Sequence, residues 1–177
     1  MINDVLKFWF EETKPEQWWK VDADFDATIK SRFGSVLSQA AAGELHTWRI
    51  EPRGRLAEIL VLDQFSRNVY RGTPGAFAQD GMALVLAQEA VAIASLEALT
   101  PKQRPFLILP YMHSESAVIH AEAMRLFEQF APDNLDFEVR HKAIIDRFGR
   151  YPHRNALLGR ESTPEELEFL KQPGSSF

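Results

Sequence analysis

The stretch DADFDATIKSRFGSVLSQAAAG, residues 22–43, sets the fold class of this chain. Its apolar side chains recur three and four residues apart, the spacing of one face of an α-helix. They are Phe25, Ile29, Phe33, Val36, Leu37 and Ala40. Asp22 or Asp24 supplies an N-cap at the start, and Gly43 can take the positive φ that ends many helices. The stretch predicts a long amphipathic helix with one buried face.

The same period continues on both sides of this stretch. It predicts helices over residues 3–12, from Pro52 through the polar residues 63–68 to an end by Gly72, over 79–99, from Ser114, over 137–148, and from Thr163 to Leu170. Thr163 and Glu166 have the spacing of a capping box at the start of the last helix. Pro110 is expected to break an apolar segment before the helix that begins at Ser114. No segment alternates apolar and polar residues between turn signals, so the sequence predicts no β-sheet. We therefore expect an all-α, compact multi-helix domain.

Length and composition indicate one soluble domain. The chain has 177 residues, 45% of them hydrophobic and 25% charged, and we expect a single domain over 1–177 whose last residues, 171–177, form a flexible tail. The absence of cysteine excludes disulfides, thiolate catalysis and cysteine-ligated metal sites. A net charge of −5 argues against a nucleic-acid partner. We see no signal peptide and no apolar run of the about 20 residues that cross a membrane, so we expect a cytoplasmic protein with no membrane partner.

Three short polar clusters interrupt the hydrophobic sequence. They are DQFSRN at 63–68, PYMHSE at 110–115 and RFGRYPHRN at 147–155. Burying an unpaired polar group costs about 1–3 kcal/mol, so such side chains must find partners or do chemical work. We expect the three clusters to meet at one shared site.

The first cluster carries Asp63 and Arg67, which are four residues apart and can pair on one face of a helix. Asn68 and Arg71 follow at the helix end. One interpretation is an arginine that is presented to an anion while Asp63 holds its guanidinium. The other is an ion pair that ends a helix, and this cluster alone favours that second interpretation.

The second cluster places His113, Ser114 and Glu115 at an expected helix start. Ser114 is a natural N-cap, and Glu115 in the first turn suits the helix dipole. His113 would then lie beside free backbone N–H groups, where it can bind an anion or act as a general acid or base. Capping explains Ser114 and Glu115 but not His113, so both interpretations stay open.

The third cluster lies in a basic block. Residues 140–160 hold six Lys or Arg and one acid, a local charge of +5 in a chain of net charge −5. These cations need acids such as Glu58, Asp63 and Glu115, or a bound anion. The charge imbalance favours a functional role. The candidate residues of the block are Arg147, His153, Arg154 and Asn155.

No pattern in the sequence names a metal or a cofactor. Asp63, His113, Glu115 and His153 are ligand types, but no HxxxH or HExxH spacing sets two of them on one helix. The sequence also lacks a GxSxG elbow, a Walker loop and a dinucleotide glycine fingerprint. Metal binding therefore stays open as the weaker alternative, and the site is predicted with neither a metal nor a cofactor.

Taken in order, the polar clusters carry a family resemblance. FWF at 8–10, WW at 18–19, DQFSRNVYRGTP at 63–74, HSE at 113–115 and RFGRYPHRN at 147–155 resemble the hallmark blocks of the bacterial domain-of-unknown-function family 924. Ser66 departs from the family pattern, which has proline there, and we expect the departure to affect a turn more than the chemistry. The resemblance implies a tetratricopeptide-like helical array and no established activity. It points to these site positions: Asp63, Arg67, Asn68, His113, Glu115, His153, Arg154 and Asn155.

In the first of three functional hypotheses, the clusters converge on a cavity that binds a small anionic molecule and is catalytic. Arg67 and Arg154 clamp the anion, with Arg147 nearby in the block, and His113 or His153 moves a proton. Asp63 and Glu115 orient these cations, and the amides of Asn68 or Asn155 donate a hydrogen bond.

Two alternatives stay open. In one, the Arg-rich face docks an acidic peptide as in a helical-repeat interaction module, which predicts that Arg147, Arg150 and Arg154 are exposed on one open face. In the other, the clusters form a buried polar network that fixes helix packing. The sequence leaves the reaction type and the oligomeric state open.

Overall fold

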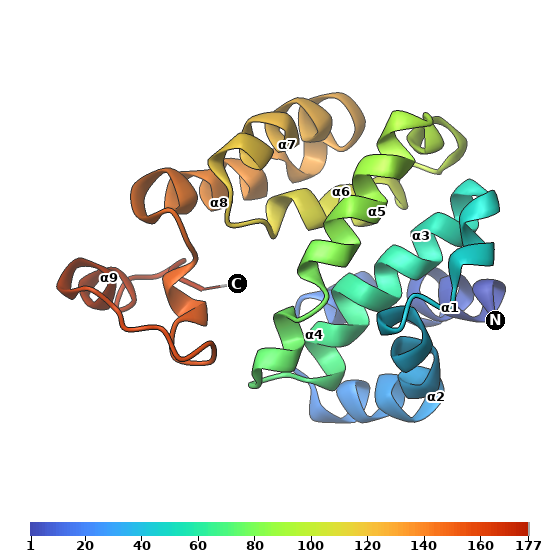
Figure 1. Ribbon diagram of the computed structural model, residues 1–177, viewed down its shortest axis with the longest axis horizontal. Coiled ribbons are helices and arrows are strands. Elements are labelled where there is room, and N and C mark those ends of the chain that lie inside the picture. The colour runs from blue at the N-terminus through green and yellow to red at the C-terminus, as the bar shows by residue number, and fades with distance from the viewer. Residues whose placement is uncertain (177) are drawn as a thin grey trace.

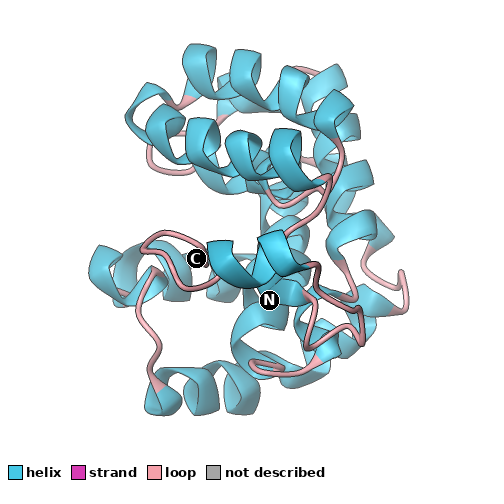
Figure 2. Cartoon of the chain, turned by 90° about the vertical axis from the view of Figure 1, so that its left-hand side faces the viewer, coloured by secondary structure: helices cyan, strands magenta, loops and turns pink. Residues whose placement is uncertain are grey.

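The computed structural model describes residues 1–176, and helices dominate this span (Figure 1). No β-strand lies within these residues (Figure 2), so the all-α prediction is confirmed. The α-helices are α1 (Ile2–Lys7), α2 (Ala23–Ala41), α3 (Pro52–Leu60), α4 (Ser66–Val69), α5 (Asp80–Ala92), α6 (Arg104–Met112), α7 (Ala117–Phe130), α8 (Leu135–Phe148) and α9 (Pro164–Phe169). Across the same span, no helix has both the length and the apolar character that a bilayer crossing requires.

Local capping signals set several helix ends where the sequence predicts them. The Asp22 carboxylate accepts hydrogen bonds from the backbone N–H groups of Asp24 and Phe25, at 3.0 and 3.1 Å, so Asp22 is the cap of α2. Gly43 follows the same helix with a φ of 74°. At α9, Thr163 and Glu166 form the expected reciprocal capping box. The cap contacts of α2 and α9 join residues two or three apart, which is why sequence alone reveals them.

Pro110 does not end the apolar segment as expected, because it lies inside α6. A proline in a helix interior costs about 3 kcal/mol, since it removes a donor and crowds the preceding turn. The side chains of Phe106, Leu107 and Leu109 around it are at most 4% exposed. Burial of each such side chain contributes about 1.5–3 kcal/mol, so tertiary packing outweighs the proline.

The helix expected at Ser114 begins three residues later, at Ala117, with Ser116 in the N-cap position. Ser114 is not the cap because it lies three residues before Ala117, and its backbone N–H donates to the carbonyl of Tyr111 at 3.2 Å. His113 and Glu115 therefore lie in the connection between α6 and α7. The expectation of an anion site on the free N–H groups of a helix that starts at Ser114 is wrong.

A π-helical segment, η4 (Val61–Phe65), joins α3 to α4 without an intervening loop. Such segments are rare and often occur at functional sites. This one carries Asp63 and Gln64, and both side chains are buried. Ser66 opens α4 and is fully buried, so its departure from the family proline falls in a helix and not, as expected, in a turn.

The core divides into two hydrophobic clusters. The larger one extends from α1 through α7, with Trp9, Phe65 and Phe127 among its fully buried side chains. The smaller one contains Ile144, Ile145 and Tyr151, and Phe148 and Phe169 pack against it. After α8 the chain turns back and carries the short 3-10 helix η8 (Pro152–Arg154) toward the start of α5 (Figure 1). The polar clusters meet along this junction.

Serine 175 packs against the end of α9. Its hydroxyl donates to the carbonyl of Leu170 at 3.1 Å, and its side chain is 5% exposed. The expected flexible tail over 171–177 stays a prediction, and Phe177 lies outside the described residues.

Candidate functional site

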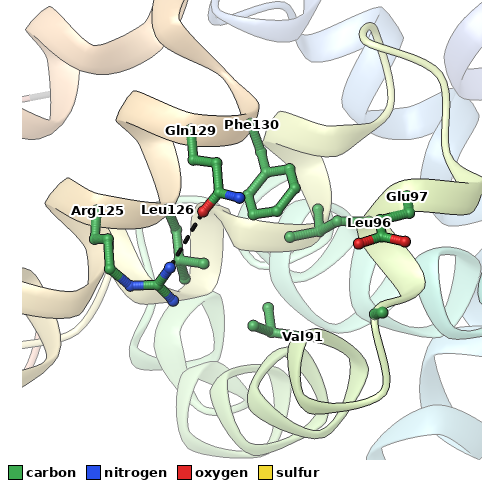
Figure 3. Close-up of a pocket in the computed structure, with 8 residues that line it drawn as sticks. Val91, Leu96, Glu97, Arg125, Leu126, Gln129 and Phe130 are labelled. Atoms are coloured by element: carbon green, nitrogen blue, oxygen red, sulfur yellow. Dashed lines mark hydrogen bonds between the residues drawn. The ribbon is translucent and has the colours of Figure 1, made fainter.

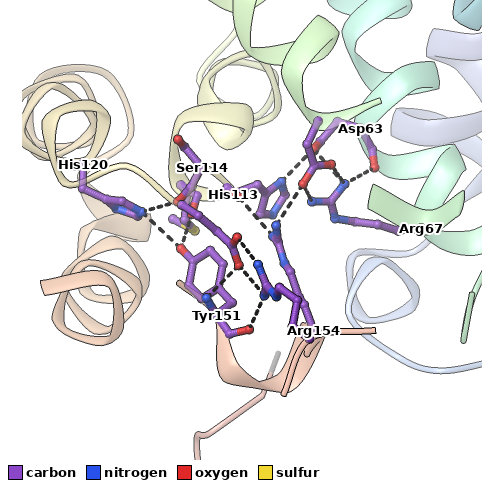
Figure 4. A network of polar contacts seen from close by, with 11 residues as sticks. Asp63, Arg67, His113, Ser114, His120, Tyr151 and Arg154 are labelled. Carbon is purple, nitrogen blue, oxygen red and sulfur yellow. Dashed lines mark hydrogen bonds and ion pairs between the residues drawn. The ribbon is translucent and has the colours of Figure 1, made fainter. Parts of the chain in front are cut away.

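The Asp63 carboxylate is the buried centre of the site, with no exposed surface. It faces Nδ1 of His113 at 2.7 Å and Nη1 of Arg67 at 3.1 Å (Figure 4). It also accepts from Nε2 of Gln64 at 2.6 Å. Burial acts to raise the pKa of Asp63, but the charge of Arg67 and the contact with His113 outweigh it and lower the pKa below its ordinary value. Asp63 is therefore an ionised carboxylate that can only accept hydrogen bonds.

The tautomer of His113 follows from that charge. Burial, reinforced by the positive charge of Arg67, lowers the pKa of His113 below its ordinary value, so the ring is neutral at pH 7. Because the Asp63 carboxylate only accepts, Nδ1 must carry the proton and donate it. Nε2 then carries a lone pair, and no group within residues 1–176 makes a hydrogen bond to it. This is the arrangement in which a carboxylate orients a histidine as a general base.

Asp80 joins two of the predicted arginines, although no signal in the sequence marks it as a site residue. Its carboxylate faces Nη1 and Nη2 of Arg67 at 2.8 and 3.1 Å, and Nη1 of Arg154 at 3.2 Å. Asp80 is the first residue of α5, and an acid in that position is normally explained by the helix dipole. With Asp63 included, the two carboxylates balance the two guanidinium groups.

Arg154 connects η8 to the His113 loop, the segment 112–116 that leaves α6 and leads into α7. Its Nη2 donates to the carbonyl oxygen of His113 at 3.1 Å. Its guanidinium lies 4.6 Å from the ring centroids of both Phe77 and Tyr151, and its side chain is only 6% exposed. Burial lowers the pKa of Arg154 despite the nearby Asp80. Its Nε is buried and has no hydrogen-bond partner among the described residues.

Glu115 and Asn155 meet at a second set of contacts through Arg160. Glu115 accepts from Nη1 and Nη2 of Arg160 at 2.6 and 3.0 Å, and from the backbone N–H of Tyr151 at 2.8 Å. Nε of Arg160 donates to Oδ1 of Asn155 at 2.9 Å. Burial acts to raise the pKa of Glu115, but its hydrogen bonds with Arg160 and Tyr151 lower it. In the sequence, Arg160 stands out only as one charge of the basic block.

His153 lies beside these contacts. It immediately precedes Arg154, and its ring centroid is 5.7 Å from that of Tyr151. Burial, together with the charge of Arg154, lowers the pKa of His153 to about 4. His153 is therefore neutral at pH 7, as His113 is.

Two predicted residues point elsewhere. Nδ2 of Asn68 donates to Asp26 on α2 at 2.7 Å, in a group shared with Arg71. Arg147 pairs with Glu165 at 2.8 Å, and its side chain is 48% exposed. The structure thus brings Asp63, Arg67, His113 and Arg154 together, with Glu115, His153 and Asn155 adjacent, while Asn68 and Arg147 engage other partners.

The basic block finds its partners largely within the same end of the chain. Arg150 pairs with Glu166 at 2.7 Å, and Lys142 pairs with Asp146 at 2.5 Å. Glu58, expected to serve this block, instead pairs with Arg49 at 2.7 Å. The side-chain exposures of Arg147, Arg150 and Arg154 are 48%, 29% and 6%. Since each of these three arginines faces an acid, they do not form the open face that an acidic peptide would need.

Neither a metal site nor the hollow shown in Figure 3 involves the predicted site residues within residues 1–176. Within residues 1–176, no group of three or more histidine, aspartate or glutamate side chains is arranged to hold a metal ion. A hollow of about 190 Å³ lies between α5 and α7, lined by Val91, Leu96, Arg125, Leu126 and Phe130 among others (Figure 3). None of the predicted site residues lines it.

Comparisons with known proteins agree on one family. The pattern of the family described as bacterial protein of unknown function, DUF924, matches residues 5–174. A solved structure of a protein of unknown function from Agrobacterium tumefaciens is 36% identical, covers 96% of each chain and superposes with a TM-score of 0.92. No curated protein matches the chain.

Proposed function

We propose a function from the geometry of the site. The chain belongs to the bacterial family of unknown function DUF924, and membership of this family supplies no activity. The proposal is that the protein binds a small anionic molecule beside His113, and that Nε2 of His113 exchanges a proton with it. The observation that carries it is the His113 ring, held at Nδ1 by the buried Asp63 while Nε2 meets no hydrogen-bonding group of residues 1–176.

The charge balance of the site supports a specific form of binding. Asp63 and Asp80 offset Arg67 and Arg154, which are already paired, so neither arginine is a free clamp. An anion beside the neutral His113 is matched only when Nε2 takes up a proton. Anion binding therefore raises the pKa of His113 and consumes about one proton per anion at neutral pH.

Arg154 supports the same location for the ligand. Its buried Nε is an unsatisfied donor in the described part of the chain, and the same guanidinium touches the backbone of His113. An unsatisfied buried donor costs about 1–3 kcal/mol, and a bound anion that accepts from it would remove that cost.

Titration calorimetry with inorganic phosphate, sulfate and acetate tests the proposal at constant ionic strength, with chloride as the reference anion. The measurement is repeated in two buffers of different ionisation enthalpy, which gives the number of protons taken up. We expect binding by at least one of these anions with an uptake of about one proton, and affinity that rises as the pH falls from 8 to 6.

His113→Asn and Arg125→Gln are the matched variants. Arg125 is 56% exposed and lies on α7 with Glu122 as its partner, so its replacement should leave anion binding unchanged. His113→Asn should abolish the proton uptake. Binding that is equal in wild type and His113→Asn, or the absence of binding by all three anions, would contradict the proposal and leave the buried network as helix architecture.

A further inference from the structure

Three consecutive carbonyl groups of the His113 loop are each held by a side chain from another part of the fold. The Tyr151 hydroxyl donates to the carbonyl of Met112. Arg154 donates to the carbonyl of His113 at 3.1 Å. Nε2 of His120 lies 2.8 Å from the carbonyl of Ser114. The backbone on both sides of the His113 ring is therefore fixed by two contacts that span 39 and 41 positions and by one that spans six.

The contact with Ser114 determines how His120 is protonated. A carbonyl oxygen only accepts, so Nε2 of His120 must carry a proton and donate it. The same nitrogen lies 3.2 Å from the Tyr151 hydroxyl oxygen, which is left as an acceptor because its own proton goes to Met112. One N–H thus contacts both the loop and the tyrosine that holds it (Figure 4).

Glu138 on α8 keeps His120 in this state. Its Oε1 lies 2.6 Å from Nδ1 of His120, and both residues are 0% exposed. A proton must lie between these two atoms, on Glu138 with a neutral ring or on Nδ1 with a charged pair. In either case the proton on Nε2 stays in place, because Nδ1 is occupied by Glu138. Oε2 of Glu138 is buried without a hydrogen-bond partner among residues 1–176, so the side chain of Glu138 makes its hydrogen bond within these residues through Oε1 to His120.

We propose that Glu138, His120 and Tyr151 form a relay of positioning residues that fixes the His113 loop and thereby holds Nδ1 of His113 on Asp63. The relay rests on the proposed function for its purpose, since a base needs a fixed ring. The contacts that form the relay do not depend on a bound ligand. None of the three residues contacts the Nε2 side of His113 through a hydrogen bond within the described residues, so they act through the loop.

The test uses the full chain with ¹⁵N-labelled histidine and reads the tautomer of each ring from long-range ¹H–¹⁵N correlations. His113→Asn assigns the His113 signals among the five histidines of the chain. In wild type we expect the Nδ1–H tautomer for His113 at neutral pH, which is the minor form of free histidine. Tyr151→Phe should shift His113 toward the Nε2–H form and move its pKa toward 6.5. Tyr111→Phe is the control. It removes the hydroxyl of another buried tyrosine, one residue before Met112, and should leave the His113 signals unchanged.

Glu138→Gln and Glu138→Leu form a second pair that does not depend on Tyr151→Phe being folded. The glutamine amide can donate to Nδ1 of His120 and keep the proton on Nε2, so the His113 signals should match wild type. Leucine removes that contact, and the His113 tautomer should become mixed. Unchanged His113 signals in folded Tyr151→Phe and Glu138→Leu would overturn the relay, even if anions bind. Failure of every anion to bind, with the signals changed as expected, would overturn the proposed function and leave the relay.

Discussion

The carboxylate of Asp63 and Nδ1 of His113 lie 2.7 Å apart although the two residues are 50 positions apart in sequence. Asp63 belongs to a π-helical segment and His113 follows the last residue of α6. Their contact joins the large hydrophobic core to the connection that leads into α7. Both the stability of this junction and any chemistry at Nε2 of His113 depend on it.

Asp63→Asn should lower the free energy of unfolding by about 3–5 kcal/mol, the usual cost of removing one partner from a buried ion pair. The amide leaves Arg67 with Asp80 alone and gives Nδ1 of His113 a weaker acceptor. Urea unfolding at pH 7.5 measures the loss. A change below about 1 kcal/mol would mean that the pair contributes no more than a surface ion pair does.

Two arginines of the same basic block should respond differently to replacement by alanine. Arg154→Ala removes a side chain that is 6% exposed and leaves Asp80 with Arg67 as its ion-pair partner. It should lower the free energy of unfolding by about 3–5 kcal/mol. Arg147→Ala removes a half-exposed ion pair with Glu165 and should cost about 0.2–1 kcal/mol. Equal losses in urea unfolding would show that burial does not separate the two sites.

Stability should fall as the pH drops below 6.5, because buried histidines resist protonation in the folded state. Burial lowers the pKa of His153 to about 4 and that of His141 to about 3, from 6.5 in the unfolded chain. The unfolded chain takes up protons first, so the stabilisation is complete above pH 6.5. Below pH 6.5, each of these two histidines lowers the free energy of unfolding by about 1.4 kcal/mol per pH unit. This loss continues until the pH reaches the pKa of that histidine in the folded state.

His153→Gln isolates one of these contributions. Between pH 6.5 and 4.5 the variant should lose stability more slowly than wild type by about 1.4 kcal/mol per pH unit. Urea unfolding at half-unit intervals of pH gives both slopes. Parallel slopes would show that His153 has a similar pKa in the folded and unfolded chains.

Glycine at position 54 should tolerate no side chain. A Cβ there would lie 2.0 Å from the carbonyl oxygen of Trp48, a backbone atom that cannot move aside. Gly54→Ala should therefore cost at least about 1–3 kcal/mol. Gly34→Ala is the control. A Cβ at this position of α2 has no atom of the described chain within 4 Å, apart from its chain neighbours and the nearby backbone of its own helix. It should stabilise the protein by about 0.5–1 kcal/mol through helix propensity, and thermal unfolding distinguishes the two signs.

Ser66→Ala should leave stability unchanged or raise it by up to about 1 kcal/mol. The Ser66 hydroxyl is buried and finds no hydrogen-bond partner in residues 1–176, so alanine removes a polar group that is not satisfied. Thermal and urea unfolding measure the change. A loss greater than about 1 kcal/mol would indicate a hydrogen bond to a buried water.

The sequence by itself determined the features that depend on neighbouring residues. The apolar period of residues 22–43, a cap at Asp22 or Asp24 and the Thr163 capping box each involve side chains within a few positions of one another. Their energies are local, so the pattern survives whatever packs around it. The pairing of Asp63 with Arg67 is of the same kind, one helical turn apart.

Tertiary structure decided which polar residues share a site. Asp80 meets Arg154 across 74 positions, and His120 meets Glu138 across 18. Neither contact has a local signature, and an acid at the start of α5 is explained equally well by capping. Packing also kept Pro110 within a helix and moved the start of α7 from Ser114 to Ala117. These outcomes depend on burial and on contacts across the fold, whose energies exceed local preferences and cannot be read from residue spacing.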